Sequence, residues 1–306
     1  MNLLAVFFPT TFLVIVLGIV IGFILSFIFF GSISVIALYF LIYIGVIRIM
    51  PLLNIIQSWI KSIFPITCKK LRTHISQSFP VKQLADIPEK GIYVIHPHGL
   101  FNMAHLMHVG TKFTAWPERN IQGTALYSLW RIPFVNELLE AFVPSNYDAM
   151  KHVLDSGKSL SLSLGGLAEA YTISPERFCL KIKDRKGAFK LAIETGTPLV
   201  PVLVYGENEI FEVMKGPSID MLAKLLNYVN IPFMFPTFQS IWKTMNLIRE
   251  PYDIKVSTFI GSPIEVEIGT ASKDRIECLR NTYMKKLEEL YKETRPAHYP
   301  DTIEFF

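Results

Sequence analysis

The motif His96-Pro97-His98-Gly99 places two imidazole side chains at the end of an apolar run. Pro97 fixes its own φ angle and Gly99 allows close backbone approach, so the rings are held where a strand meets a loop. A neutral imidazole can take a proton from a hydroxyl group near neutral pH. The motif therefore predicts catalytic roles for His98, as general base, and for His96, with Gly99 and Asn102 contacting substrate. Two structural histidines that bond a turn would have the same spacing.

Two further histidines, His105 and His108, follow the motif within a short segment of the chain. A metal site is the rival interpretation of such a cluster. The spacing matches neither HExxH nor a pair of histidines with one carboxylate, and no acidic residue lies between His96 and Glu118. We therefore expect no metal ion, and we expect His105 and His108 to pack on a helix over residues 101–109.

A second cluster has the sequence GGLAE and runs from Gly165 to Glu169. Its glycines, Gly165 and Gly166, permit a tight turn after a strand and present backbone amides that could bind an oxyanion. Glu169 is predicted to be the third catalytic residue, because a carboxylate can orient a histidine as it does in a catalytic triad. An acid that interacts with the dipole at a helix start is the alternative.

Two more polar clusters are candidates for substrate binding. Arg185 and Lys186 precede a helix that opens at Gly187, and basic side chains beside free amides attract phosphate. Glu207 and Asn208 follow an apolar run and could orient a polar head group. A solvated charge run and a turn that bonds its own backbone are the respective alternatives.

Three short apolar runs, at residues 92–95, 160–164 and 199–205, each end in one of these clusters. Because these runs are continuously apolar, they predict strands of a sheet that is covered on both faces. Ligands of open α/β sheets bind beyond the carboxyl ends of the strands, so the clusters are expected to meet at one site. The predicted fold is α/β with a mainly parallel sheet.

Helices are predicted between and after these strands. Residues 147–154 end at Ser156-Gly157, and residues 187–194 end at Gly196, which suits a C-terminal cap. An apolar stripe near the end of the chain predicts an amphipathic helix packed on the core. Its members are Ile276, Leu279, Tyr283, Met284, Leu287, Leu290 and Tyr291.

The first part of the chain has the composition of a membrane anchor. No Asp, Glu, Lys or Arg occurs between Met1 and Ile47, and a span needs about 20 apolar residues. The weak break at residues 31–34 predicts a transmembrane hairpin over residues 1–50. An interfacial helix and linker are expected over 51–80, and the catalytic domain over 81–306.

The charge distribution indicates on which side of the membrane the catalytic domain lies, and it excludes several classes of protein. Residues 1–85 hold six basic side chains and no acidic one, so the positive-inside rule places the catalytic domain in the cytosol. A basic excess confined to the flank of an apolar segment fits an anionic bilayer and not nucleic acid. With 51% hydrophobic and 18% charged residues the chain is not disordered, and three distant cysteines do not form a disulfide framework.

Taken in order, these blocks resemble the type-2 diacylglycerol acyltransferase family, which also contains monoacylglycerol and wax-alcohol acyltransferases. The resemblance covers about residues 10–295. It is carried by Phe79-Pro80, HPHG at 96–99, GGLAE at 165–169, RKGAFKLA at 185–192, LVPVLVYGEN at 199–208 and GSPIEV at 261–266. It implies that His96, His98 and Glu169 are catalytic, and that Arg185 and Lys186 lie in the family's basic block.

The resemblance implies esterification of diacylglycerol by acyl-CoA without a bound cofactor, in the endoplasmic reticulum membrane, with lipid droplets as a second location. Monoacylglycerol or a long-chain alcohol is the alternative acceptor, and the oligomeric state stays open, with a homodimer as one option. A lysophospholipid acyltransferase would need aspartate at Phe101 or Met103. A histidine-rich metalloenzyme and a non-catalytic lipid-binding protein are two further hypotheses that the sequence leaves open.

Overall fold

The computed structural model describes residues 80–100, 102–110, 120–127, 141–170, 177–210 and 256–306, together with six single positions between 214 and 237. All of them belong to one compact unit, Arg72–Phe306. The predicted hairpin over 1–50 and almost all of the predicted segment over 51–80 lie outside these residues. No helix within the described ranges is long and apolar enough to cross a membrane.

The centre of this unit is a seven-stranded sheet with the order β1-β8-β7-β2-β5-β3-β4. The five strands from β7 to β4 are parallel, β8 is antiparallel to β7, and β1 is parallel to β8. The mainly parallel α/β sheet predicted from the apolar runs is thus confirmed. Its strands are β1 Val81–Gln83, β2 Ile92–His96, β3 Ile121–Ala125, β4 Phe142–Pro144, β5 Ser159–Leu162, β7 Leu199–Tyr205 and β8 Ser257–Ile260.

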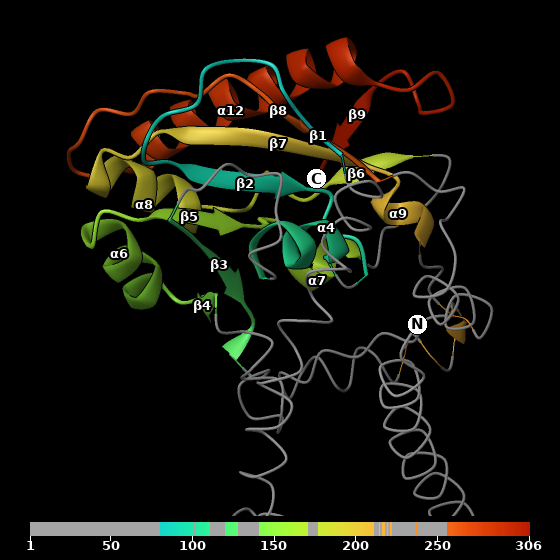
Figure 1. Cartoon of the computed structure of the whole chain (residues 1–306), viewed down its shortest axis with the longest axis horizontal. Helices are drawn as coiled ribbons and strands as arrows, with labels where there is room; N and C mark the ends of the chain where they lie inside the picture. Colours follow the sequence, from blue (N-terminus) through green and yellow to red (C-terminus); the bar gives the residue numbers. More distant parts are fainter. Residues whose placement is uncertain are drawn as a thin grey trace, which may run out of the picture. The chain divides into compact units, whose positions relative to one another are not determined.

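Helices lie between and after the strands (Figure 1). They are α4 Met103–His105, which continues as the π-helix η1 Leu106–Gly110, α6 Tyr147–Asp155, α7 Gly166–Ala170, α8 Gly187–Thr195, α9 Glu207–Ile210 and α12 Lys273–Thr294. A second sheet pairs β6 Phe178–Leu180 with β9 Ile303–Phe305.

The predicted helix ends are confirmed. Helix α8 stops at Gly196, which has a φ of +59° and forms the left-handed C-terminal cap expected of glycine. The Asn146 side chain accepts a hydrogen bond from the Ala149 amide at the start of α6, and Ser272 does the same for Arg275 at the start of α12. Local sequence therefore sets the ends of the helices that cover the sheet.

The two central strands are buried on both faces, as their continuous apolar runs predict. On one face, Ile92, Val94 and Leu203 join the apolar residues of α6, α8 and α12 in the larger core cluster. On the other face, Tyr93 and Val202 belong to a second cluster with Leu100 and Ala104. Helix α12 runs along the sheet beside β7 (Figure 1). Its predicted apolar stripe is confirmed, with five members buried and Leu279 and Met284 half-buried.

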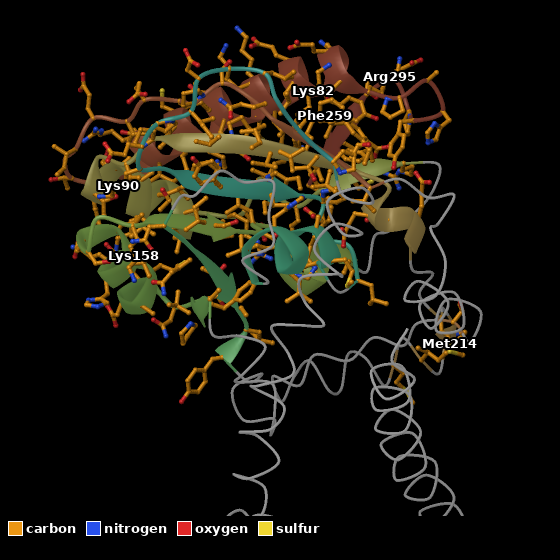
Figure 2. All side chains as sticks on the ribbon, viewed as in Figure 1. Lys82, Lys90, Lys158, Met214, Phe259 and Arg295 are labelled. Carbon is orange, nitrogen blue, oxygen red and sulfur yellow. The ribbon has the colours of Figure 1, made fainter. Side chains whose placement is uncertain are left out.

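The order β7-β2-β5 brings three strand ends together. His96 pairs with Leu203 of β7, and Val94 pairs with Leu162 of β5, so the three parallel strands end at the same edge of the sheet, β2 two residues beyond β5 and β7 two residues beyond β2. Helices α4, α7 and α9 begin just beyond these ends. Lys90 and Lys158, which precede β2 and β5, mark the opposite edge of the sheet (Figure 2). The predicted meeting of the polar clusters at one edge is confirmed.

Candidate active site

His96 is the last residue of β2 and lies in the core. Its side chain is fully buried, and Nε2 is 3.0 Å from the Oη atom of Tyr283 on α12. Burial lowers the pKa of His96 to about 3, so the ring is neutral at physiological pH. Nδ1 has no hydrogen-bond partner in the described part of the chain. The ring therefore connects the central strand to the helix that covers it.

His98 lies in the loop after β2, and its hydrogen bond defines its tautomer. Nδ1 is 2.8 Å from the carbonyl oxygen of Gly99. Since a carbonyl only accepts, Nδ1 carries the proton, and Nε2 of the neutral ring keeps its lone pair. Burial lowers the pKa of His98, and the bond to Gly99 partly opposes this. The ring is thus a neutral base whose basic atom is Nε2.

Glu169 holds the loop by its main chain. Oε1 accepts a hydrogen bond from the amide of His98 at 2.6 Å, and Oε2 accepts one from the amide of Lys181 at 2.9 Å. The sequence predicted that this carboxylate would orient the imidazole, but the carbonyl of Gly99 makes that contact instead. Burial raises the pKa of Glu169 to about 7. The two amides and the nearby Arg185 act in the opposite direction and lower the pKa.

Gly165 is needed for the close approach of Glu169. A Cβ atom at Gly165 would overlap the Glu169 carboxyl group. The carbonyl oxygen of Gly165 accepts a hydrogen bond from Nη2 of Arg185 at 2.8 Å. Gly166 begins α7 with a φ of +55°. The structure thus joins the second and third clusters, while the predicted oxyanion role of the Gly165 and Gly166 amides stays a prediction.

Asn102 anchors the other end of the HPHG loop. It has the left-handed conformation, and its amide nitrogen is 2.9 Å from Oγ of Ser163 and 3.0 Å from Nδ1 of His105. The sequence predicts Asn102 as a substrate contact; in the structure its side chain bonds the residue that follows β5 and the last residue of helix α4. His105 is buried beside Phe142, and His108 lies 2.8 Å from Oγ1 of Thr258. The packing predicted for these two histidines is confirmed.

Glu207 is buried and binds main-chain amides, while its predicted contact with a head group stays a prediction. Its side chain is 1% exposed. Oε1 accepts from the amide of Met103 at 2.6 Å and Oε2 from the amide of Ala104 at 2.9 Å. Burial raises its pKa to about 7. The sequence pattern does not reveal that Glu207 is buried, because an acidic residue after a strand end is exposed in most folds. The Oδ1 atom of Asn208 is buried and has no partner in the described ranges.

Arg185 and Lys186 lie where the sequence places them, before α8. Arg185 is half-buried, with Nε 3.8 Å from Oδ1 of Asp184, and Lys186 is exposed at the N-terminal cap of α8. Lys186 therefore presents its ammonium group to solvent beside the first amides of a nine-residue helix. This arrangement suits an anionic ligand.

Two site residues, Tyr283 and Ser163, were not identified from the sequence. The sequence predicts Tyr283 only as part of the apolar stripe of α12, and it assigns no role to Ser163. A buried tyrosine needs a partner for its hydroxyl group, which is the signal that could have pointed from Tyr283 to a polar atom of the core. Ser163 carries no comparable signal.

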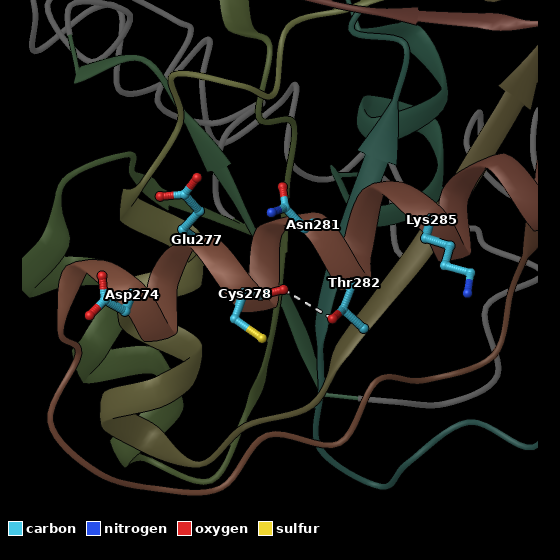
Figure 3. Close-up of a pocket in the computed structure, with 6 residues that line it drawn as sticks. All are labelled: Asp274, Glu277, Cys278, Asn281, Thr282 and Lys285. Atoms are coloured by element: carbon cyan, nitrogen blue, oxygen red, sulfur yellow. Dashed lines mark hydrogen bonds between the residues drawn. The ribbon is translucent and has the colours of Figure 1, made fainter.

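The described side chains at this edge form no metal site. No three His, Cys, Asp or Glu residues among them come together as ligands. A depression of about 570 Å³ lies on the exposed side of α12, away from the strand ends (Figure 3). Its lining comes from one helix: Asp274, Glu277, Cys278, Asn281, Thr282 and Lys285. The chemistry-bearing residues lie elsewhere, at the strand ends.

Comparisons with known proteins match most of the chain. A family model described as "Diacylglycerol acyltransferase" matches residues 26–303. The chain is 28% identical to 2-acylglycerol O-acyltransferase 1 of Mus musculus over 78% of its own length and 74% of that protein. It is 30% identical to the same-named protein of Bos taurus, over 66% of its own length and 64% of that protein. It is 27% identical to diacylglycerol O-acyltransferase 2 of Dictyostelium discoideum, over 67% of its own length and 66% of that protein.

The chain thus spans about two thirds to three quarters of the length of these relatives. A solved structure, the 1-acyl-sn-glycerophosphate acyltransferase of Thermotoga maritima, has a TM-score of 0.45 and 16% identity, with 75% of this chain and 77% of that chain covered.

Proposed function

Because this chain belongs to the diacylglycerol acyltransferase family, it is an acyltransferase, and we propose that it esterifies diacylglycerol with the acyl group of acyl-CoA. Within the structure, the hydrogen bond from Nδ1 of His98 to the carbonyl of Gly99 carries this proposal. It leaves Nε2 as a proton acceptor beyond the central strand of the sheet. Such a base activates a hydroxyl group, which is what transfer to an alcohol needs.

The reaction needs no acyl-enzyme intermediate. The free hydroxyl of diacylglycerol gives its proton to Nε2 of His98 as its oxygen attacks the thioester carbon. The tetrahedral intermediate then collapses, the carbon–sulfur bond breaks, and the thiolate of CoA takes the proton from the imidazolium. The products are triacylglycerol and CoA. Amides near Gly165 and Gly166 support the oxyanion, and Glu169 holds the main chain of His98 in place.

The donor binds through its phosphates at the start of α8. Lys186 is exposed there, and Arg185 lies beside it. Both are close to the base in the fold, because Arg185 bonds the carbonyl of Gly165 and Gly165 contacts Glu169. A phosphate site on this side of the fold holds the donor, and its pantetheine arm extends from there to bring the thioester to the base.

The glyceride comes from the bilayer, and the uncharged segment before Arg48 is its route of contact. In this proposal residues 1–50 form a hairpin in the endoplasmic reticulum membrane, and the catalytic domain faces the cytosol, where acyl-CoA is available. Protease added to intact microsomes should digest tags at Met1 and at Phe306. Protection of the Phe306 tag would place His98 on the wrong side of the membrane for this reaction.

Monoacylglycerol is the second candidate acceptor. Two of the relatives reported above are named 2-acylglycerol O-acyltransferase 1, at 28% and 30% identity. A monoacylglycerol presents the same nucleophile, a free hydroxyl group on glycerol, so the mechanism at His98 is unchanged. The two acceptors differ in the apolar bulk that the site must hold.

The test is acyl transfer by detergent-purified full-length chain. Radiolabelled acyl-CoA is supplied with diacylglycerol, monoacylglycerol, a long-chain alcohol or lysophosphatidic acid, and both CoA release and labelled lipid are measured. We expect triacylglycerol as the main product. Greater turnover with monoacylglycerol would favour the second candidate, and binding of glyceride without CoA release would contradict both.

A further inference from the structure

Glu207 has an unusual environment for a carboxylate, because it is buried. It follows β7, the neighbour of the central strand, and its side chain turns into the protein, where 1% of it is exposed. Two main-chain amides are its hydrogen-bond donors. Burial of a carboxylate costs free energy, so such a residue needs a structural or functional reason.

Its contacts all lead to the segment that carries His98. Oε1 and Oε2 accept from the amides of Met103 and Ala104, the first amides of helix α4. A Cβ atom added at Gly99 would lie 2.5 Å from Cγ and 2.6 Å from Oε1 of Glu207. Gly99 also has a φ of +62°, which favours glycine. The carboxylate therefore packs against the last residue of HPHG and caps the helix that follows.

The opposite side of the loop repeats this arrangement. Glu169 follows β5, the other neighbour of the central strand, and accepts from the amide of His98. Its carboxyl group packs against Gly165, as that of Glu207 packs against Gly99. Two buried carboxylates, one after each neighbouring strand, thus bond main-chain amides on either side of the HPHG turn: Glu169 that of His98, and Glu207 those of Met103 and Ala104.

We propose that Glu207 is a positioning residue for acyl transfer, which fixes the HPHG turn relative to helix α4 through main-chain amides and thereby sets the position of the His98 ring. The Nδ1 atom of His98 donates to the carbonyl of Gly99, and Gly99 lies against Glu207. A shift of Gly99 therefore moves the hydrogen bond that orients the base. A displacement of about 1 Å at a catalytic group can lower the rate about 100-fold.

Glu207→Gln is the decisive variant because it keeps the size of the side chain. Glutamine has one acceptor oxygen, and its amide nitrogen would face a second main-chain N–H donor. One of the two bonds to Met103 and Ala104 is then lost. Glu207→Asp keeps both acceptor oxygens on a shorter side chain and should recover part of the loss. Glu209→Gln is the matched control, since Glu209 lies two residues on, with 39% of its side chain exposed.

The experiment has two readouts on the full chain in detergent, and its kinetic half rests on the proposed function. For Glu207→Gln we expect kcat to fall about 100-fold, with the KM for acyl-CoA little changed, because the donor site at α8 is intact. Hydrogen exchange at the amides of Met103 and Ala104 should accelerate, while exchange in α12 stays as in wild type. Glu209→Gln should match wild type in both measurements.

Wild-type kcat in Glu207→Gln, or unchanged exchange at Met103 and Ala104, would overturn the inference. A wild-type chain that releases no CoA with any acceptor would instead contradict the proposed function, and the exchange result alone then decides whether Glu207 holds the loop. If Glu207→Gln does not fold, Glu207→Asp provides both readouts, with a smaller loss of kcat expected.

Discussion

Glu169 holds His98 by its main-chain amide and not by its ring. The carboxylate oxygen Oε1 lies 2.6 Å from the amide nitrogen, while Nδ1 of the same residue donates to Gly99. The carboxylate therefore sets where the loop lies, and the loop's own carbonyl sets which nitrogen is basic. This differs from a catalytic triad, in which a carboxylate bonds the imidazole directly.

The contact between Gly165 and Glu169 predicts that Gly165→Ala is damaging. Its methyl group would overlap the buried carboxyl group, and overpacking of this kind costs about 1–3 kcal/mol. We expect a lower midpoint of thermal unfolding together with a large loss of CoA release. Gly187→Ala is the control for stability, because a Cβ there meets nothing within 4 Å. Equal midpoints for the two variants would show that Glu169 moves aside easily.

The position of Lys186 and Arg185 predicts a selective defect in donor binding. Replacing both by alanine should raise the KM for acyl-CoA and weaken its dependence on salt, since charge attraction to the phosphates is lost. The KM for the glyceride should change little. Lys190→Ala removes one positive charge from the same helix and should leave the acyl-CoA KM near wild type. Parallel rises in the KM for both substrates would indicate a damaged fold instead.

Buried ionisable groups predict a stability maximum near pH 6.5. Burial lowers the pKa values of His96, His105 and His108 to between about 3 and 4, so they contribute stability above their ordinary pKa of 6.5 that is lost as the pH falls. Burial raises the pKa values of Glu169 and Glu207 from 4.5 to about 7. The stability that these two groups contribute at low pH is therefore lost as the pH rises from 4.5 to about 7.

The three buried histidines outnumber the two buried glutamates, so stability should change more steeply with pH on the acid side of the maximum than on the alkaline side. Thermal midpoints measured from pH 4.5 to 8 check this expectation. His108→Gln keeps a polar atom near Thr258 and removes one titrating group, and it should flatten the acid side. A stability that rises steadily as the pH falls to 5 would contradict the assignment of neutral buried histidines.

The fold was largely readable from local patterns. Gly196 marks the end of α8 because glycine tolerates the left-handed cap, and the run at 199–205 has the same bounds as β7. The meeting of the strand ends followed from the rule for ligands in open α/β sheets. These features depend on neighbours in sequence or on a general property of parallel sheets.

The roles of individual site residues were less predictable. Glu207 looks like a head-group ligand in sequence, yet it turns inward to amides that lie more than a hundred positions earlier. Tyr283 looks like an apolar stripe residue, yet its hydroxyl contacts His96. Both depend on which segments the tertiary fold places together, and periodicity along one element carries no information about that.

The most direct measurement of the central claim is CoA release by His98→Ala compared with wild type and with the exposed control His152→Ala. If Nε2 of His98 is the general base, kcat should fall by about two to four orders of magnitude. The unfolding midpoint should stay near wild type, because the ring lies in a loop at the edge of the core. Retention of wild-type turnover in His98→Ala, with a normal midpoint, would contradict the assignment of His98 as the base.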